Sequence, residues 1–129
     1  MKDGTIHDRQ ITASSEFSAR HNASNARLDR PATDDSIGAW TVATKDLNQW
    51  IQVEFSTYTY VSGIILQGRE DFGNQWVTRY QVEYSSDGVI WQYVTDDNYV
   101  NDMVSIELTL RLTTLYIESS LLTMKPFLV

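Results

Sequence analysis

The stretch QWVTRYQVEYSSDGVIWQYV, residues 75–94, most constrains the fold of this chain. Bulky and polar side chains alternate on both sides of SSDG, and this period is typical of a β-strand with one buried face. Gly88 can adopt the positive φ that a tight turn requires. The stretch therefore predicts a β-hairpin, and we expect its aromatic face to be core. That face carries Trp76, Thr78, Tyr80, Val82 and Tyr84, opposite Val77, Arg79, Gln81 and Glu83.

Other stretches also have strand character. QWIQVEF, residues 49–55, places Ile51, Val53 and Phe55 on one face, and YVSGIILQG, residues 60–68, predicts a short, more fully buried strand. No window of a dozen residues has helical periodicity with credible caps. We therefore expect one all-β domain over residues 1–129, built as a sandwich or barrel. A later amphipathic strand is predicted from the alternating residues Val104, Ile106, Leu108, Leu110 and Leu112.

A long polar segment separates the first strands. Residues 14–49 contain few apolar side chains, with Pro31 and Gly38 as turn formers. Loops of this length in a compact domain are usually functional, because recognition commonly resides in loops on a rigid frame. We therefore expect the function to lie in these loops.

The composition excludes several classes of function. Seventeen acidic against ten basic residues give a net charge of −7, which opposes binding to nucleic acid and to anionic membranes. The chain has no cysteine, and therefore no disulfide, thiolate zinc site or cysteine nucleophile. The first ten residues contain no apolar segment, so no signal peptide is expected in this chain, and no run approaches the ~18 apolar residues of a membrane span.

From IHDRQITASSEF (6–17) onward the chain resembles the discoidin family, also called the coagulation factor V/VIII type C domain. The resemblance continues in register through ARL (26–28), QWIQVEF, VSGIILQGR (61–69) and WVTRYQVEYSSDG (76–88), with Trp40 and Trp91 between and after them. It covers roughly residues 1–94. The closing motifs of the family are not found beyond residue 95, so residues 95–129 are expected to be an atypical C-terminal segment, an alternative end of the domain.

The resemblance implies a fold and a function. Members fold as a jelly-roll-like antiparallel β-sandwich, and they act as extracellular adhesion and ligand-binding modules of larger secreted or cell-surface proteins. Their ligands include glycans, proteins and phospholipids, which loops at one end of the sandwich hold. We therefore expect a non-catalytic extracellular module that recognises glycan or protein ligands.

Carried over residue by residue, the resemblance places projecting loops at residues 17–22, 40–45 and 69–74. Phe17 and Phe72 stand out, since a large apolar residue at a loop tip either needs a partner or packs back against its own loop. Relatives that grip a peptide carboxylate have an acid where Lys45 stands, so a mixed basic and aromatic rim favours glycans or protein surfaces. The candidate ligand-binding residues are Phe17, Ser18, Arg20, His21, Thr41, Lys45, Arg69, Glu70, Asp71 and Phe72.

Three alternatives stay open. The first is a phospholipid-binding module, which is weaker than the glycan or protein hypothesis. One buried Phe contributes only ~2–3 kcal/mol, and Glu70 and Asp71 offset the charge of the nearby basic residues. Calcium could bind Asp34 and Asp35, although two acids fall short of a full ligand set. A fragment or accessory domain of a glycan-active enzyme is the third, but no nucleophile pairs with a base in the sequence. Asn22–Ala23–Ser24 is also an N-glycosylation sequon.

Overall fold

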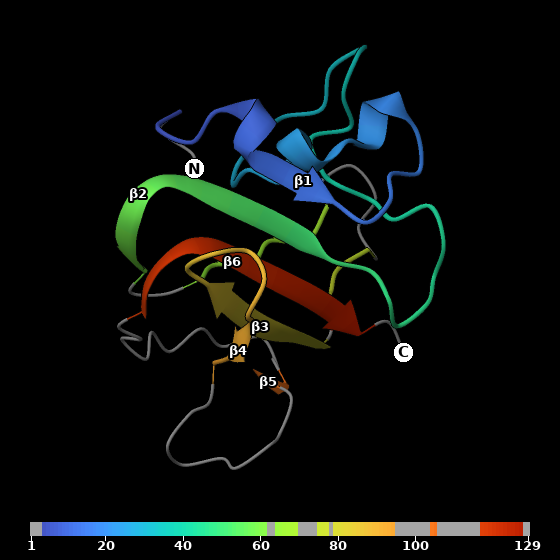
Figure 1. Ribbon diagram of the computed structural model, residues 1–129. Helices are drawn as coiled ribbons and strands as arrows, with labels where there is room; N and C mark the ends of the chain where they lie inside the picture. Colours follow the sequence, from blue (N-terminus) through green and yellow to red (C-terminus); the bar gives the residue numbers. More distant parts are fainter. Residues whose placement is uncertain are drawn as a thin grey trace.

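A computed structural model describes residues 4–61, 64–69, 75–77, 79–94, 104–105 and 117–127. The described residues contain six β-strands, three single turns of 3-10 helix and no α-helix (Figure 1). None of their helical segments is long or apolar enough to cross a bilayer. The elements are η1 (Asp8–Gln10), β1 (Ile11–Ala13), η2 (Ala19–His21), η3 (Ala23–Asn25), β2 (Ile51–Val61), β3 (Arg79–Ser85), β4 (Gln92–Tyr93), β5 (Val104–Ser105) and β6 (Ile117–Phe127).

The six strands form one antiparallel sheet in the order β1-β2-β6-β3-β4, with β5 also paired to β3. The last strand, β6, lies between β2 and β3 (Figure 1), so Leu122 is opposite Val53 on one side and Tyr84 on the other. The register of the β2–β6 pairing shifts between Glu54 and Thr59, so the ladder is irregular there. The C-terminal strand therefore joins the two halves of the sheet.

The predicted hairpin is confirmed. β3 and β4 pair through Glu83 with Tyr93 and Tyr84 with Gln92, and Gly88 has the expected positive φ of 72°. In the turn, the backbone N–H groups of Ile90 and Val89 donate to Oδ1 of Asp87 and hold the pKa of this carboxyl below its usual value. The turn is therefore held by a side-chain acceptor as well as by glycine.

The core face of the hairpin is only partly as predicted. Tyr80 and Val82 are both 7% exposed, and burial raises the pKa of Tyr80. Trp76 is 53% exposed, because residues 75–77 precede β3 and are not part of the sheet. The prediction for Trp76 is therefore wrong, Tyr84 is half-buried, and Thr78 lies outside the described residues.

Two other predicted strands differ from the structure. β2 continues through Val61, and residues 64–69 form no strand, so the predicted strand at residues 60–68 is wrong. Of the predicted strand at Val104–Leu112, Val104 and Ser105 form β5, and the rest lies outside the described residues. The strand that completes the sheet is instead β6, which the sequence pattern did not single out.

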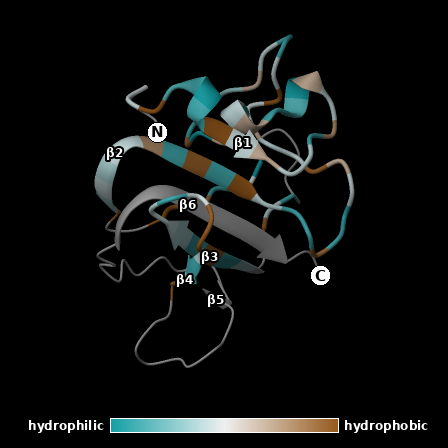
Figure 2. Ribbon diagram, in the orientation of Figure 1, coloured by the Kyte–Doolittle hydropathy of each residue, from teal (hydrophilic) through white to brown (hydrophobic). Residues whose placement is uncertain are grey.

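Two apolar clusters position the loops. Figure 2 shows apolar and polar residues alternating along β2, and its apolar residues Ile51 and Val53 are 5% and 9% exposed. Ile51 packs with Ile11 and Ala23, and half-buried Trp40 contacts this cluster. The loop segment that contains Ala23 and Trp40 is therefore anchored to β1 and β2. The second cluster is centred on Tyr80 and Val82.

Candidate ligand-binding site

Backbone hydrogen bonds join two loops beside β1. We call residues 14–26 the first loop and residues 33–49 the second loop. The N–H of Phe17 donates to the carbonyl of Thr41 (2.8 Å), and the N–H of Thr41 donates to the carbonyl of His21 (3.3 Å). The N–H of Ile37 donates to the carbonyl of Arg20 (3.1 Å). The structure thus brings together Phe17, His21 and Thr41, as the sequence predicted for one site.

Ser15 connects the bases of the two loops. Its carbonyl accepts from Nε1 of Trp40 (2.9 Å), and its hydroxyl oxygen accepts from the N–H of Ala43 (3.1 Å) while the hydroxyl donates to Oε1 of Gln49. Nε2 of buried Gln49 donates in turn to Asp46 (2.9 Å), and this bond lowers the pKa of the Asp46 carboxyl, with help from the backbone N–H of Asn48. These bonds hold the second loop in one position relative to the first.

An exposed aromatic side chain stands at the tip of the first loop. Phe17 is 64% exposed, and its ring meets the His21 ring edge to face, with centroids 5.1 Å apart and planes at 72°. Nδ1 of His21 is hydrogen-bonded to Oγ of Ser18 (2.7 Å). The two rings therefore support one another, and much of the phenyl ring remains in solvent. We call Phe17, Ser18, His21 and Thr41 the aromatic rim.

The predicted basic residues lie at different places. Arg20 is exposed, and its Nη2 donates to the carbonyl of Thr33 (3.2 Å). Lys45 is exposed on the second loop. Nη1 of Arg69 donates to Oε1 of Gln75 (3.1 Å), and both residues come after the two loops in the sequence. The predicted residues Glu70, Asp71 and Phe72 lie outside the described residues.

Asp34 and Asp35 form the exposed tip of a tight turn. The turn is closed by hydrogen bonds between the backbones of Thr33 and Ser36, at 2.6 and 3.3 Å. Among the described residues, no group of three or more His, Asp or Glu side chains converges as a metal site would require. The guanidinium of Arg20 at the base of the turn adds positive charge there, which disfavours a cation.

The sequence did not identify all residues of this surface. Leu47 is 59% exposed on the second loop, between Asp46 and Asn48, and Gln49 is 6% exposed although it is the last residue of the predicted polar segment 14–49. Two polar neighbours in a turn were the available signal for the exposure of Leu47. The burial of Gln49 could not be predicted from the local sequence alone, because it depends on Ser15, 34 residues away, as well as on nearby Asp46.

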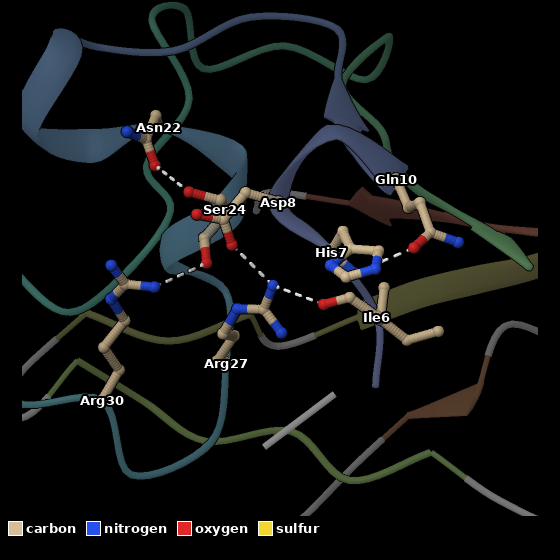
Figure 3. Close-up of polar contacts among 8 residues, drawn as sticks. All are labelled: Ile6, His7, Asp8, Gln10, Asn22, Ser24, Arg27 and Arg30. Carbon is tan, nitrogen blue, oxygen red and sulfur yellow. Dashed lines mark hydrogen bonds and ion pairs between the residues drawn. The ribbon is translucent and has the colours of Figure 1, made fainter. Parts of the chain in front are cut away.

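The first loop is also tied to the N-terminal segment (Figure 3). Nη2 of Arg27 donates to the carbonyl of Ile6 (2.7 Å) and to Oδ1 of Asp8 (2.6 Å). The Arg27 side chain is only 12% exposed, and Asp8 is 65% exposed. Nη1 of Arg30 donates to the carbonyl of Ser24 (3.2 Å). The two arginines therefore hold the end of the first loop and the residues that follow it in place.

Comparison with known sequences gives the family. The F5/8 type C domain profile matches residues 10–124, so the resemblance extends beyond the expected end near residue 95 and into β6. The chain is 40% identical over 111 residues to the human EGF-like repeat and discoidin I-like domain-containing protein 3, and 38% identical over 103 residues to bovine lactadherin. These matches cover 81% and 74% of the chain but 22% and 23% of the relatives, so it spans about a fifth of their length.

Solved structures agree on the fold. Recombinant discoidin II of Dictyostelium discoideum superposes with a TM-score of 0.72 at 24% identity, over 91% of this chain and 48% of that one. The CpGH89CBM32-5 module from Clostridium perfringens superposes with a TM-score of 0.62 at 15% identity, over 95% and 87%. These neighbours confirm the predicted all-β, galactose-binding-domain-like sandwich. The chain belongs to the F5/8 type C, or discoidin, domain family.

Proposed function

We propose that this chain is a non-catalytic adhesion module that binds glycan or protein ligands through the aromatic rim. One observation carries the proposal: Phe17 is 64% exposed at a loop tip, yet its backbone is hydrogen-bonded to Thr41 of the other loop. When a large apolar side chain is already held rigidly, little conformational entropy is lost as a ligand buries it. That combination is typical of a binding site.

The chemistry of the rim suits a sugar or a protein surface. A phenyl ring packs on the apolar face of a sugar, while His21, Arg20 and Lys45 can hydrogen-bond to hydroxyl or carbonyl groups. Burying the exposed part of Phe17 contributes about 1–2 kcal/mol. Two neighbours of similar fold are complexes with GalNAc-β-1,3-galactose and with galactose, which makes galactose-terminated glycans the first ligands to test.

The setting we propose is extracellular or on the cell surface, within a larger protein. Support comes from the relatives, which are about five times as long as the matched region. Residues 1–129 then act as one domain, whose sheet β6 completes. The third predicted loop, with Arg69, Glu70, Asp71 and Phe72, contributes further contacts in this proposal.

A phospholipid surface is the second candidate, because Leu47 adds another exposed apolar side chain on the loop next to Phe17. Two such residues contribute about 2–4 kcal/mol when they enter a bilayer. The net charge of −7 disfavours anionic lipid. Sedimentation with phosphatidylcholine and phosphatidylserine vesicles, with and without calcium, tests this candidate and the Asp34 and Asp35 calcium hypothesis together. Binding that depends on both Phe17 and Leu47 would favour it over glycans.

Phe17→Ala tests the proposal on an array of galactose-terminated glycans and extracellular matrix proteins. The loss of about 1–2 kcal/mol predicts roughly 5- to 30-fold weaker binding. Tyr58→Ala is the matched control, since Tyr58 is 63% exposed on β2 and should leave binding unchanged. Equal effects of the two substitutions, or no binding by the wild-type chain, would contradict the proposal. Cleavage of the array glycans would favour an enzyme instead.

A further inference from the structure

Asn22 lies next to the aromatic rim, at the junction of η2 and η3. Asn22–Ala23–Ser24 is the only Asn-X-Ser/Thr triplet in the 129 residues. The asparagine has an extended backbone (φ −68°, ψ 162°) and is half-buried. Ala19 and Arg20, which lie three and two residues before it, are exposed. An N-glycan acceptor requires such an asparagine in a surface loop, followed two residues later by a hydroxyl.

The side chains of this triplet are arranged in a way that is compatible with modification. The Ser24 hydroxyl donates to Oδ1 of Asn22 (2.8 Å, Figure 3), and Nδ2 of Asn22 donates to the carbonyl of Ala19 (3.1 Å). A glycan on Nδ2 replaces one of its two hydrogens, so the amide keeps one N–H donor and its whole acceptor. Ala23, only 3% exposed, anchors the middle of the triplet in the core. The fold therefore retains its anchors after modification.

We propose that Asn22 carries an N-linked glycan and that this glycan restricts access to the aromatic rim. Nδ2 attacks the anomeric carbon of an oligosaccharide that is carried as a polyisoprenyl diphosphate ester. The new C–N bond forms as the C–O bond to the diphosphate breaks, Nδ2 loses a proton, and the lipid diphosphate leaves. Because His21 directly precedes Asn22 and contacts Phe17, the sugar stands beside the rim. The restriction of access rests on the proposed function.

The modification is tested by secreting residues 1–129 behind a cleavable leader from eukaryotic cells. Intact mass before and after peptide N-glycosidase should show one glycan on the wild-type chain. Asn22→Gln and Ser24→Ala should lack it, while Ser24→Thr, which keeps the hydroxyl, should retain it. Asn48→Gln is the control, an exposed asparagine outside any sequon. A folded, secreted wild-type chain without glycan would overturn the proposal, as would a glycan that persists in Asn22→Gln.

Access is tested separately, on galactose-terminated glycans. The secreted glycoform should bind at least tenfold more weakly than Asn22→Gln from the same cells and than wild-type chain made in bacteria. Equal binding by all three would show that the glycan leaves the rim open and would overturn the access role. If the bacterial chain binds nothing, the access role fails together with the proposed function. The mass measurement decides the modification itself in either case.

Discussion

Replacing Gly38 with alanine tests the close backbone approach that shapes the second loop. Gly38 has a φ of +69°, and a Cβ there would lie 2.3 Å from the carbonyl oxygen of Arg30 and 2.9 Å from the carbonyl carbon of Pro31. Both are backbone atoms, so no side chain can rotate away. Gly4 provides the matched control, because it has a φ of +78° and nothing within 4 Å of its Cβ position.

The expected magnitude follows from the two geometries. Forcing an L-residue into the left-handed region costs about 1–2 kcal/mol, and the less flexible unfolded chain offsets about 0.4–1 kcal/mol of this. Gly4→Ala should therefore lower the free energy of unfolding by about 0.5–1 kcal/mol. At Gly38 the steric clash adds about 1–3 kcal/mol, for a total of about 2–4 kcal/mol. In a domain of this size that lowers the melting temperature by roughly 6–15 °C.

Urea denaturation followed by tryptophan fluorescence measures both variants. Trp40 lies two residues after Gly38 and packs against the first apolar cluster, so it reports on this region. The difference between the two glycine variants isolates the clash, because the positive φ is common to both. If the free energies of unfolding of the two variants agree within about 0.5 kcal/mol, the close approach at Gly38 is refuted.

Four further substitutions test individual contacts. Arg27→Leu should lower the free energy of unfolding by about 1–3 kcal/mol, since the Arg27 side chain is 12% exposed and donates to the carbonyl of Ile6 and to Asp8. Asp8→Asn changes a 65% exposed side chain and should cost less than about 1 kcal/mol. Equal losses for the two variants in urea denaturation would contradict this. Trp40→Phe removes the donor to Ser15 and should cost about 1–2 kcal/mol in thermal denaturation, and an unchanged melting temperature would refute it. Backbone N–H donors lower the pKa of Asp87 in the folded state below its ordinary 3.8. Their hydrogen bonds to the ionised carboxylate therefore stabilise the fold above that pH, and this stabilisation is lost as the pH falls. From about pH 5 to about pH 2, the melting temperature should fall more steeply for the wild type than for Asp87→Asn, and parallel curves would count against the contact.

The sequence predicted strands where one face packs on the core. It did not predict which segments pair by hydrogen bonds with neighbouring strands. Residues 64–66 resemble a strand because Ile64 and Leu66 pack on the second cluster while Ile65 is 51% exposed. The segment belongs to no strand and has no ladder partner among the described strands. β6 has the opposite character: it is hydrogen-bonded on both edges, yet it contains adjacent Leu121 and Leu122 instead of alternation. Side-chain period reports burial and does not report hydrogen-bonded neighbours.

The same limit applies to the candidate site. The position of Phe17 in a projecting loop could be predicted from the family resemblance, while the sequence left open whether the ring is exposed or packs back on its own loop. Its pairing with Thr41 could not, since irregular backbone bonds between loops follow no periodic rule. The burial of Gln49 was missed for a related reason, because an amide is buried only when partners satisfy it, and here Ser15, far away in the sequence, does so together with nearby Asp46.

These bonds separate the groups that hold the rim from the groups that can meet a ligand. The loops are joined by main-chain atoms of Phe17, His21 and Thr41 and by the side chain of Ser15, all of which are independent of the phenyl ring. Phe17 and Leu47 project more than half of their surface into solvent. Substituting these two side chains should therefore change what the domain binds at little cost in stability, whereas substituting Ser15 should weaken binding of every ligand. A frame whose loops are held by backbone bonds can present different tip residues, and so different specificities, on the same sheet.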